Sequence, residues 1–228
     1  MIIDINQAET CYILGYFWAD CFLGPNAFMF EIKTDDFILL RPIFENLGMT
    51  KFSTRTRKNS KNSQSSVKFY KKEELKFFKE NGFDKKKERC ELYFKLSDEM
   101  KPFFIKGFLD GDGCISYITK DNHIRVSFNG AHSQNWDFLE DFLIKHNIPY
   151  KIYNKTRPSH DITHKKLIHS YSVMELCGLQ NKVNFCKLID DIPFGVQRKI
   201  QVFRDFKEYR IGRSLEEQKH SQFLDIQF

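Results

Sequence analysis

Residues 104–113 read Phe104-Ile105-Lys106-Gly107-Phe108-Leu109-Asp110-Gly111-Asp112-Gly113. Its glycines at 107 and 111 are four residues apart, so on a helix they lie on one face. A glycine inside a helix costs about 0.5–1 kcal/mol relative to alanine, and close approach of a second helix backbone would offset that cost. The stretch therefore predicts a helix that packs through its glycine face, with Asp112 near its end and Gly113 as its terminator.

The N-terminal half contains a second copy of this pattern. Residues 12–20 read Tyr12-Ile13-Leu14-Gly15-Tyr16-Phe17-Trp18-Ala19-Asp20. Small residues again recur four apart, and an aspartate again falls where the helix should end. We expect the two helices to pack against each other through Gly15, Ala19, Gly107 and Gly111. Packing side by side would bring Asp20 and Asp112 together, each at a helix C-terminus where the macrodipole disfavours an anion.

The chain that follows each of these helices also repeats. The segment Lys51-Phe52-Ser53-Thr54-Arg55-Thr56-Arg57 is in register with Lys151-Ile152-Tyr153-Asn154-Lys155-Thr156-Arg157. Helical patterns precede both segments, at 36–47 and 136–146, and strand candidates precede those, at 28–33 and at 114–118 with 124–128. Further strands (65–70, 169–176) and helices (72–81, 179–189) follow.

Each half therefore reads helix, strand, strand, helix, strand, strand, helix, which predicts an α+β protein built from two pseudo-symmetric αββαββα repeats. We place the first repeat at residues 1–83, a linker at 84–98, the second repeat at 99–191 and a basic helical tail at 192–228.

The positive charge is concentrated in one segment. The chain has 36 Lys and Arg against 30 Asp and Glu, and residues 51–90 hold 14 of the basic and 5 of the acidic residues. A solvated basic face is one interpretation. Basic residues interleaved with strand formers instead favour a ribbon that lies along phosphates. Our candidate nucleic-acid contacts are Lys33, Lys51, Arg55, Arg57, Lys68, Arg125, Lys151, Lys155 and Arg157.

Several classes of protein are disfavoured by composition. No uncharged apolar run approaches the roughly 18–20 residues that a membrane span needs, and the N-terminus lacks the pattern of a secretory signal. Six scattered cysteines without a Cys-x-x-Cys pair predict free thiols in a reducing, intracellular compartment.

Two carboxylates that lie close together repel each other, and a bound cation would offset this repulsion. Oxygen ligands favour Mg²⁺, which proteins bind through one or two carboxylates completed by waters and phosphate oxygens. Metal ions next to a basic surface are typical of phosphodiester hydrolysis. Asp20 and Asp112 are therefore candidate metal ligands and catalytic residues.

Both motif segments resemble the LAGLIDADG motif, and two copies 92 residues apart resemble a single-chain LAGLIDADG homing endonuclease. The second copy matches closely over residues 107–113. The first has Trp18 in place of an acid and Cys21 in place of the final glycine, but it keeps Asp20. The resemblance covers about residues 8–190. It implies an antiparallel β saddle over the DNA major groove, packed through two LAGLIDADG helices, and cleavage of both strands at a long site.

The resemblance also implies a metal site. Asp20 and Asp112 match the family's metal-binding acids, and the carbonyls of the preceding residues, Ala19 and Gly111, are implied to face the metals. Two or three Mg²⁺ ions shared between the two acids are the expected cofactors.

Family members often place a lysine near each scissile phosphate, on or just after the last strand of each repeat. Lys71 or Lys72 matches this position in the first repeat. The matching stretch of the second repeat reads Leu176-Cys177-Gly178, so that Lys182 is the nearest candidate. Preferential nicking of one strand would follow from this asymmetry.

The leading hypothesis is a monomeric, sequence-specific, Mg²⁺-dependent endonuclease that cuts double-stranded DNA. The alternative is a binding protein on the same fold, either an RNA maturase that binds intron RNA or a DNA-binding protein without catalysis. The degenerate first motif and the unmatched second lysine favour the alternative. The two intact acids favour the enzyme.

Overall fold

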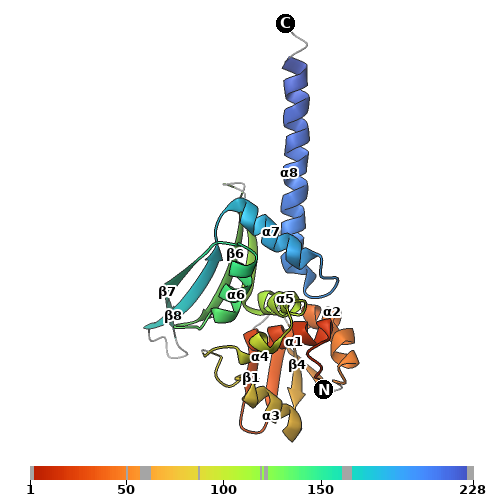
Figure 1. Ribbon diagram of the computed structural model, residues 1–228, viewed down its shortest axis with the longest axis vertical. Helices are drawn as coiled ribbons and strands as arrows, with labels where there is room; N and C mark the ends of the chain where they lie inside the picture. Colours follow the sequence, from red (N-terminus) through yellow and green to blue (C-terminus); the bar gives the residue numbers. More distant parts are fainter. Residues whose placement is uncertain are drawn as a thin grey trace.

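The computed structural model describes residues 3–49, 51–56, 63–86, 88–118, 120, 123–160 and 166–224 (Figure 1). The elements of the first half are, in chain order, α1 (Ala8–Asp20), β1 (Cys21–Leu23), β2 (Phe28–Lys33), α2 (Thr34–Asn46), β3 (Phe52–Thr56), β4 (Ser63–Phe69) and α3 (Lys72–Glu80). Those of the second half are α5 (Lys101–Asp112), β5 (Gly113–Ile118), β6 (His123–Ala131), α6 (Asp137–Lys145), β7 (Tyr150–His160), β8 (Lys166–Leu176) and α7 (Leu179–Asp190). Both halves therefore have the predicted αββαββα order.

The strands confirm the repeat at the level of topology. Within the described residues they form two four-stranded antiparallel sheets, with the orders β1-β2-β4-β3 and β5-β6-β8-β7. These orders are the same once each strand is replaced by its counterpart. The α+β class and the paired sheets predicted from the sequence are confirmed.

Helices α1 and α5 lie side by side between the two sheets, at the centre of the molecule (Figure 1). Their small residues make the close approach possible. A Cβ atom added to Gly15 would overlap the carbonyl oxygen of Phe104, and one added to Gly107 would overlap the carbonyl oxygen of Tyr12. The predicted helix interface is thereby confirmed at both glycines.

Phenylalanine side chains, of which the chain has 24, fill much of the space between each central helix and its sheet. Phe17 of α1 packs against Phe28 of β2, with ring centroids 4.9 Å apart, and the ring of Phe108 in α5 stacks on Phe128 of β6 at 5.8 Å. One face of each sheet therefore packs against the core. The other face, which we call the open face, is not covered by a helix of the core.

Two elements were not expected in this form. A short helix, α4 (Glu91–Lys95), lies within the segment interpreted as a linker. The tail is helical as predicted, and α8 (Gln197–Leu224) extends far beyond the body (Figure 1). Its first turns, however, are packed into the core, where Ile200 and Phe203 are buried together with Val196, which immediately precedes the helix. Among the described residues, none of the helices combines the length and the apolar composition that a membrane-spanning segment requires.

The helix interface generates a stability prediction. We expect Gly107→Ala to lower the free energy of unfolding by about 3 kcal/mol, because the new methyl group meets backbone and not a flexible side chain. Urea unfolding followed by circular dichroism measures the change. Gly24→Ala is the control, since its nearest neighbour is the Phe22 side chain at 3.2 Å. Equal stability of the two variants would contradict close packing at Gly107.

Candidate active site

The two aspartates are brought together by the packing of the helices that they end. Asp20 is the last residue of α1 and Asp112 the last residue of α5. A Cβ atom added to Gly111 would lie 3.2 Å from Asp20 Oδ2, so this carboxylate rests against the other helix. Asp20 is exposed and Asp112 half-buried. The acid pair, as we call Asp20 and Asp112, therefore lies at the surface between the repeats.

The electrostatics of the acid pair are unfavourable without a cation. Desolvation raises the pKa of Asp112 from 3.8 to about 7, and the nearby charge of Asp20 adds to this shift. Desolvation also raises the pKa of Asp20. Because desolvation disfavours both ionised forms, and the charge of Asp20 further disfavours that of Asp112, the acid pair is a site where a cation would be stabilised.

Two lysines that sequence reasoning missed reach the same place. Lys86 Nζ donates to the carbonyl oxygen of Ala19 at 3.0 Å, and Lys199 Nζ donates to that of Gly111 at 3.0 Å. The positive charges of both lysines lower the pKa of each aspartate. No local motif could have revealed them, because their partners are backbone atoms far away in the sequence.

Lys199 closes the C-terminal end of α5. Its ammonium group also donates to the carbonyl oxygens of Leu109 (2.8 Å), Asp110 (2.7 Å) and Gly113 (2.7 Å). The last carbonyls of a helix lack intrahelical partners, and a cation there is favoured by the macrodipole. Burial lowers the pKa of Lys199 to about 8, so the group is mainly charged at neutral pH.

The donor set fits a hard divalent cation in part. The acid pair supplies carboxylate oxygens, which Mg²⁺ and Mn²⁺ prefer together with waters and phosphate oxygens. Within the described ranges, no cluster of three or more His, Cys, Asp or Glu side chains could hold a metal. The carbonyl oxygens of Ala19 and Gly111, which are expected to face the metals, each accept a hydrogen bond from a lysine, and their contact with a metal stays a prediction.

The structure does not bring the predicted catalytic lysines, Lys71, Lys72 and Lys182, to the acid pair. Lys182 is buried on α7 beside His123, 2.7 Å from its Nε2. His123 pairs with Ile118, at the far end of β5 from Asp112. Lys72 lines a hollow with Pro25 and Asn26, in the turn between β1 and β2. Lys71 comes immediately before Lys72 and lines a different hollow, one beside Lys51 and Lys68.

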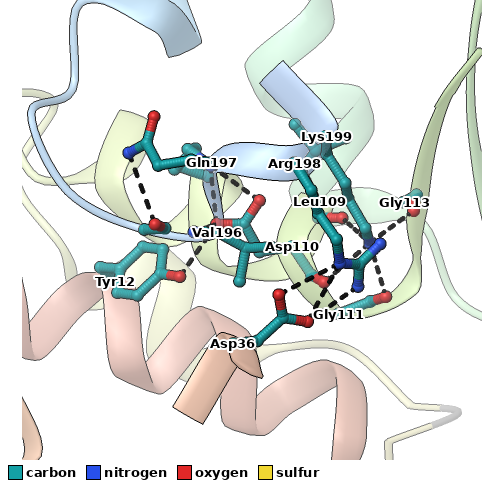
Figure 2. A network of polar contacts seen from close by, with 12 residues as sticks. Tyr12, Asp36, Leu109, Asp110, Gly111, Gly113, Val196, Gln197, Arg198 and Lys199 are labelled. Atoms are coloured by element: carbon teal, nitrogen blue, oxygen red, sulfur yellow. Dashed lines mark hydrogen bonds and ion pairs between the residues drawn. The ribbon is translucent and has the colours of Figure 1, made fainter. Parts of the chain in front are cut away.

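A buried polar network docks the tail onto both repeats (Figure 2). Asp110 accepts hydrogen bonds from Lys106, from the Tyr12 hydroxyl at 2.9 Å and from the backbone N–H of Val196 at 2.8 Å. Arg198 meanwhile forms a two-pronged ion pair with Asp36 of α2 at 3.0–3.1 Å. Contacts to both halves fix the start of α8, and this is what places Lys199 at the end of α5.

The open faces of the two sheets carry the predicted nucleic-acid contacts. Directly paired residues of an antiparallel sheet point to the same side, so the register assigns each residue to a face. The open faces include the basic residues Lys33, Arg55, Lys68, Arg125, Lys151, Lys155 and Arg157. Lys51 comes just before β3, and the alternation of side chains along that strand assigns it to the same face as Arg55. Arg57 lies outside the described residues.

Two arginines on these faces are held by carboxylates. Arg55 forms an ion pair with Glu31 at 2.6 Å. Arg125 donates to Glu175 at 3.0 Å and to the Tyr153 hydroxyl at 3.2 Å. Guanidinium groups held in this way are pre-oriented over the open face of each sheet.

Comparison with known proteins identifies the fold. No protein-family model and no curated protein matches the sequence. Among solved structures, the chain is similar to the meganuclease I-SmaMI bound to uncleavable DNA, with 12% identity, a TM-score of 0.53 and coverage of 96% of this chain and 92% of that one. The homing endonuclease I-WcaI, bound to its DNA recognition sequence, has 14% identity and a TM-score of 0.51, covering 87% and 86%.

A third similar structure is a variant of I-DmoI in complex with its target DNA in the presence of Mn, with 14% identity and a TM-score of 0.51. The match covers 84% of this chain and 98% of that one. At these identities the likeness establishes the fold. This chain has the fold of the single-chain LAGLIDADG homing endonucleases.

Proposed function

We propose that this protein is a Mg²⁺-dependent endonuclease of the homing type that cuts double-stranded DNA at a long, specific site. The observation that carries the proposal is the acid pair at the joined ends of α1 and α5. It lies between two sheets whose open faces carry basic side chains. The similar structures solved with DNA support the same conclusion.

The chemistry follows from the placement of the carboxylates. Asp20 and Asp112 would hold divalent ions between the repeats, with remaining coordination positions left to water and to phosphate oxygens of the two strands. Such ions supply an activated water and neutralise charge on the scissile phosphate. One acid from each repeat gives one carboxylate for each strand, which suits the cleavage of both strands by a single chain.

The open faces of the sheets would supply affinity and sequence recognition. Lysines of these faces, such as the exposed Lys33 and the half-buried Lys155, suit phosphate contacts, which position the duplex. Arg55 and Arg125, oriented by their carboxylate partners, suit bidentate contacts to guanine edges in the major groove. Carboxylates such as Glu31 and Glu175 can accept from cytosine amino groups.

The first prediction concerns cleavage. Asp20→Asn and Asp112→Asn should each abolish double-strand cleavage, because an amide is a much weaker metal ligand, while DNA binding is kept. The parent protein is incubated in Mg²⁺ with genomic DNA and a randomised duplex library, and new ends are sequenced. Asp35→Asn, an exposed acid on α2, is the matched control. Unchanged cleavage by both acid variants would contradict the assignment of Asp20 and Asp112 as metal ligands that cleavage requires.

The same experiment distinguishes the alternative functions. Sequences that are bound but never cut, by parent and variants alike, would favour a DNA-binding protein without catalysis. Absence of duplex binding together with tight binding of a structured intron transcript would favour a maturase.

The second prediction concerns the open faces. Lys33→Ala and Lys155→Ala should each weaken binding to a random-sequence duplex by about threefold to tenfold, because each removes a phosphate contact. Each should also lower the slope of log affinity against log salt by about 1. Fluorescence anisotropy across a salt series measures both. Lys76→Ala, on the exposed side of α3, should leave both unchanged. Equal effects of all three variants would contradict the assignment of faces.

The third prediction concerns the acid pair without metal. The pKa of Asp112 is about 7 in the folded protein against a usual value of 3.8. Its ionisation therefore destabilises the fold as the pH rises from about 4 to above 7. Asp112→Asn removes this charge and should raise the free energy of unfolding at pH 8 by about 1–2 kcal/mol, after allowance for solvent screening of a half-buried group.

At pH 5 the gain should be clearly smaller, because the parent carboxyl is already largely protonated there. Urea unfolding in the presence of a chelator measures both values. A gain that is independent of pH, or a loss of stability at pH 8, would contradict the raised pKa.

A further inference from the structure

The open face of the first sheet carries exposed apolar side chains among polar ones. Phe22 of β1 and Tyr70, which follows β4, are 64% and 53% exposed, although most large apolar side chains of the described residues are buried. The other paired residues of this face, apart from Met29 and Lys68, are Glu31, Lys33, Ser53, Arg55, Gln64 and Ser66. An exposed apolar patch with a polar rim is typical of a surface that another molecule contacts.

These side chains surround a hollow of about 320 Å³. Phe22 pairs with Met29, and Met29 pairs with Lys68, so that three neighbouring strands contribute to it. The ring of Phe22 lies against the turn between β1 and β2, where a Cβ atom added to Gly24 would be 3.2 Å from Phe22 Cε1. We call this hollow the apolar hollow; it is lined chiefly by Phe22, Pro25, Ala27, Met29, Lys68 and Tyr70.

The apolar hollow lies close to the acid pair. Phe22 is two residues after Asp20. Its side chain also lines a second hollow, which reaches Ala19 and Asp112. Phe22 therefore stands between the apolar hollow and the site proposed for cleavage. A group that enters the apolar hollow belongs to the nucleotides next to those at the acid pair.

The second repeat has different chemistry at the equivalent place. Since Asp20 corresponds to Asp112, Phe22 corresponds to Cys114, and the strand register then matches Met29 with Ser127 and Lys68 with Glu175. None of these three counterparts has a large apolar side chain. The apolar side chains are thus a property of the first repeat, and the two halves of a DNA site would be read differently here.

The chemistry of duplex DNA limits what can occupy an apolar hollow. In the major groove the base pairs present hydrogen-bond donors and acceptors and one apolar substituent, the 5-methyl group of thymine. An apolar side chain gains from contact with this methyl group, whereas an unpaired amino or carbonyl group of a base would lose hydration against it. Lys68, at the rim, suits contact with a neighbouring phosphate.

We propose that Phe22, together with Met29 and Tyr70, recognises the 5-methyl group of a thymine in the major groove next to the cleavage position, in the half-site bound by the first repeat. The inference rests on the proposed function, because it takes duplex DNA as the ligand of the open faces. It makes Phe22 a specificity-determining residue that does not take part in the chemistry at the acid pair.

The test measures the coupling between one side chain and one methyl group. Duplexes that the parent protein binds are recovered from a randomised library and sequenced, and each thymine of a recovered duplex is replaced in turn by uracil, which lacks only the methyl group. At one thymine the replacement should weaken binding of the parent by about threefold to fivefold, the factor that burial of one methyl group corresponds to. Phe22→Ala should bind the thymine and uracil duplexes equally.

The matched control is Cys114→Ala, at the equivalent position of the second repeat. It should keep the full difference between thymine and uracil. Phe22→Leu retains an apolar side chain and should keep part of it. Because Phe22 is largely exposed, Phe22→Ala should fold like the parent, and circular dichroism checks this. Cytosine at the same position should bind more weakly than 5-methylcytosine, since the effect follows the methyl group.

The outcomes separate this inference from the proposed function. A parent protein that binds or cuts duplex DNA but is insensitive to uracil at every thymine overturns the inference alone. The same holds if Phe22→Ala keeps the full uracil effect, or if Cys114→Ala loses it. Loss of the effect in Phe22→Ala only supports the inference, even where no cleavage is found. Failure of the parent to bind any duplex overturns both.

Discussion

The close contact between α1 and α5 is the constraint on which the rest of the structure depends. Gly15 and Gly107 each face a backbone carbonyl of the other helix, so neither position has room for a side chain. In each helix the contacting glycine precedes the terminal aspartate by the same number of residues, so the contact also brings the two aspartate-bearing ends together. The geometry that joins the repeats therefore also creates the acid pair, and stability and chemistry cannot be varied independently here.

The electrostatic cost of that contact explains the basic residues around it. Two carboxylates at helix C-termini are disfavoured by the macrodipoles, by partial burial and by each other. Lys86 and Lys199 offset these terms in the absence of metal, and they also satisfy backbone carbonyls that the helix ends leave without partners. The two ammonium groups thus provide part of the charge compensation that a bound cation would give the carboxylates.

The sequence predicts the elements that depend on local spacing. Glycines four residues apart predict the helix interface, and repetition of the strand and helix patterns predicts two equivalent sheets. The lysines near the acids could not be predicted in the same way. Lys182 is near the expected position in the sequence, yet it lies beside His123 at the far end of β5. Lys199 is 87 residues beyond Asp112, and only the docking of the tail brings it back.

The docking of the tail follows from a difference between the two helices. Where α1 has Leu14 and Trp18, the equivalent positions of α5 are Lys106 and Asp110, which form a buried ion pair at 2.6 Å. A buried pair is stable only when its remaining hydrogen-bonding capacity is satisfied. Tyr12 and the backbone of Val196 supply those bonds. The polar substitution in one repeat thus requires the tail, and the tail in turn carries Lys199 to the acid pair.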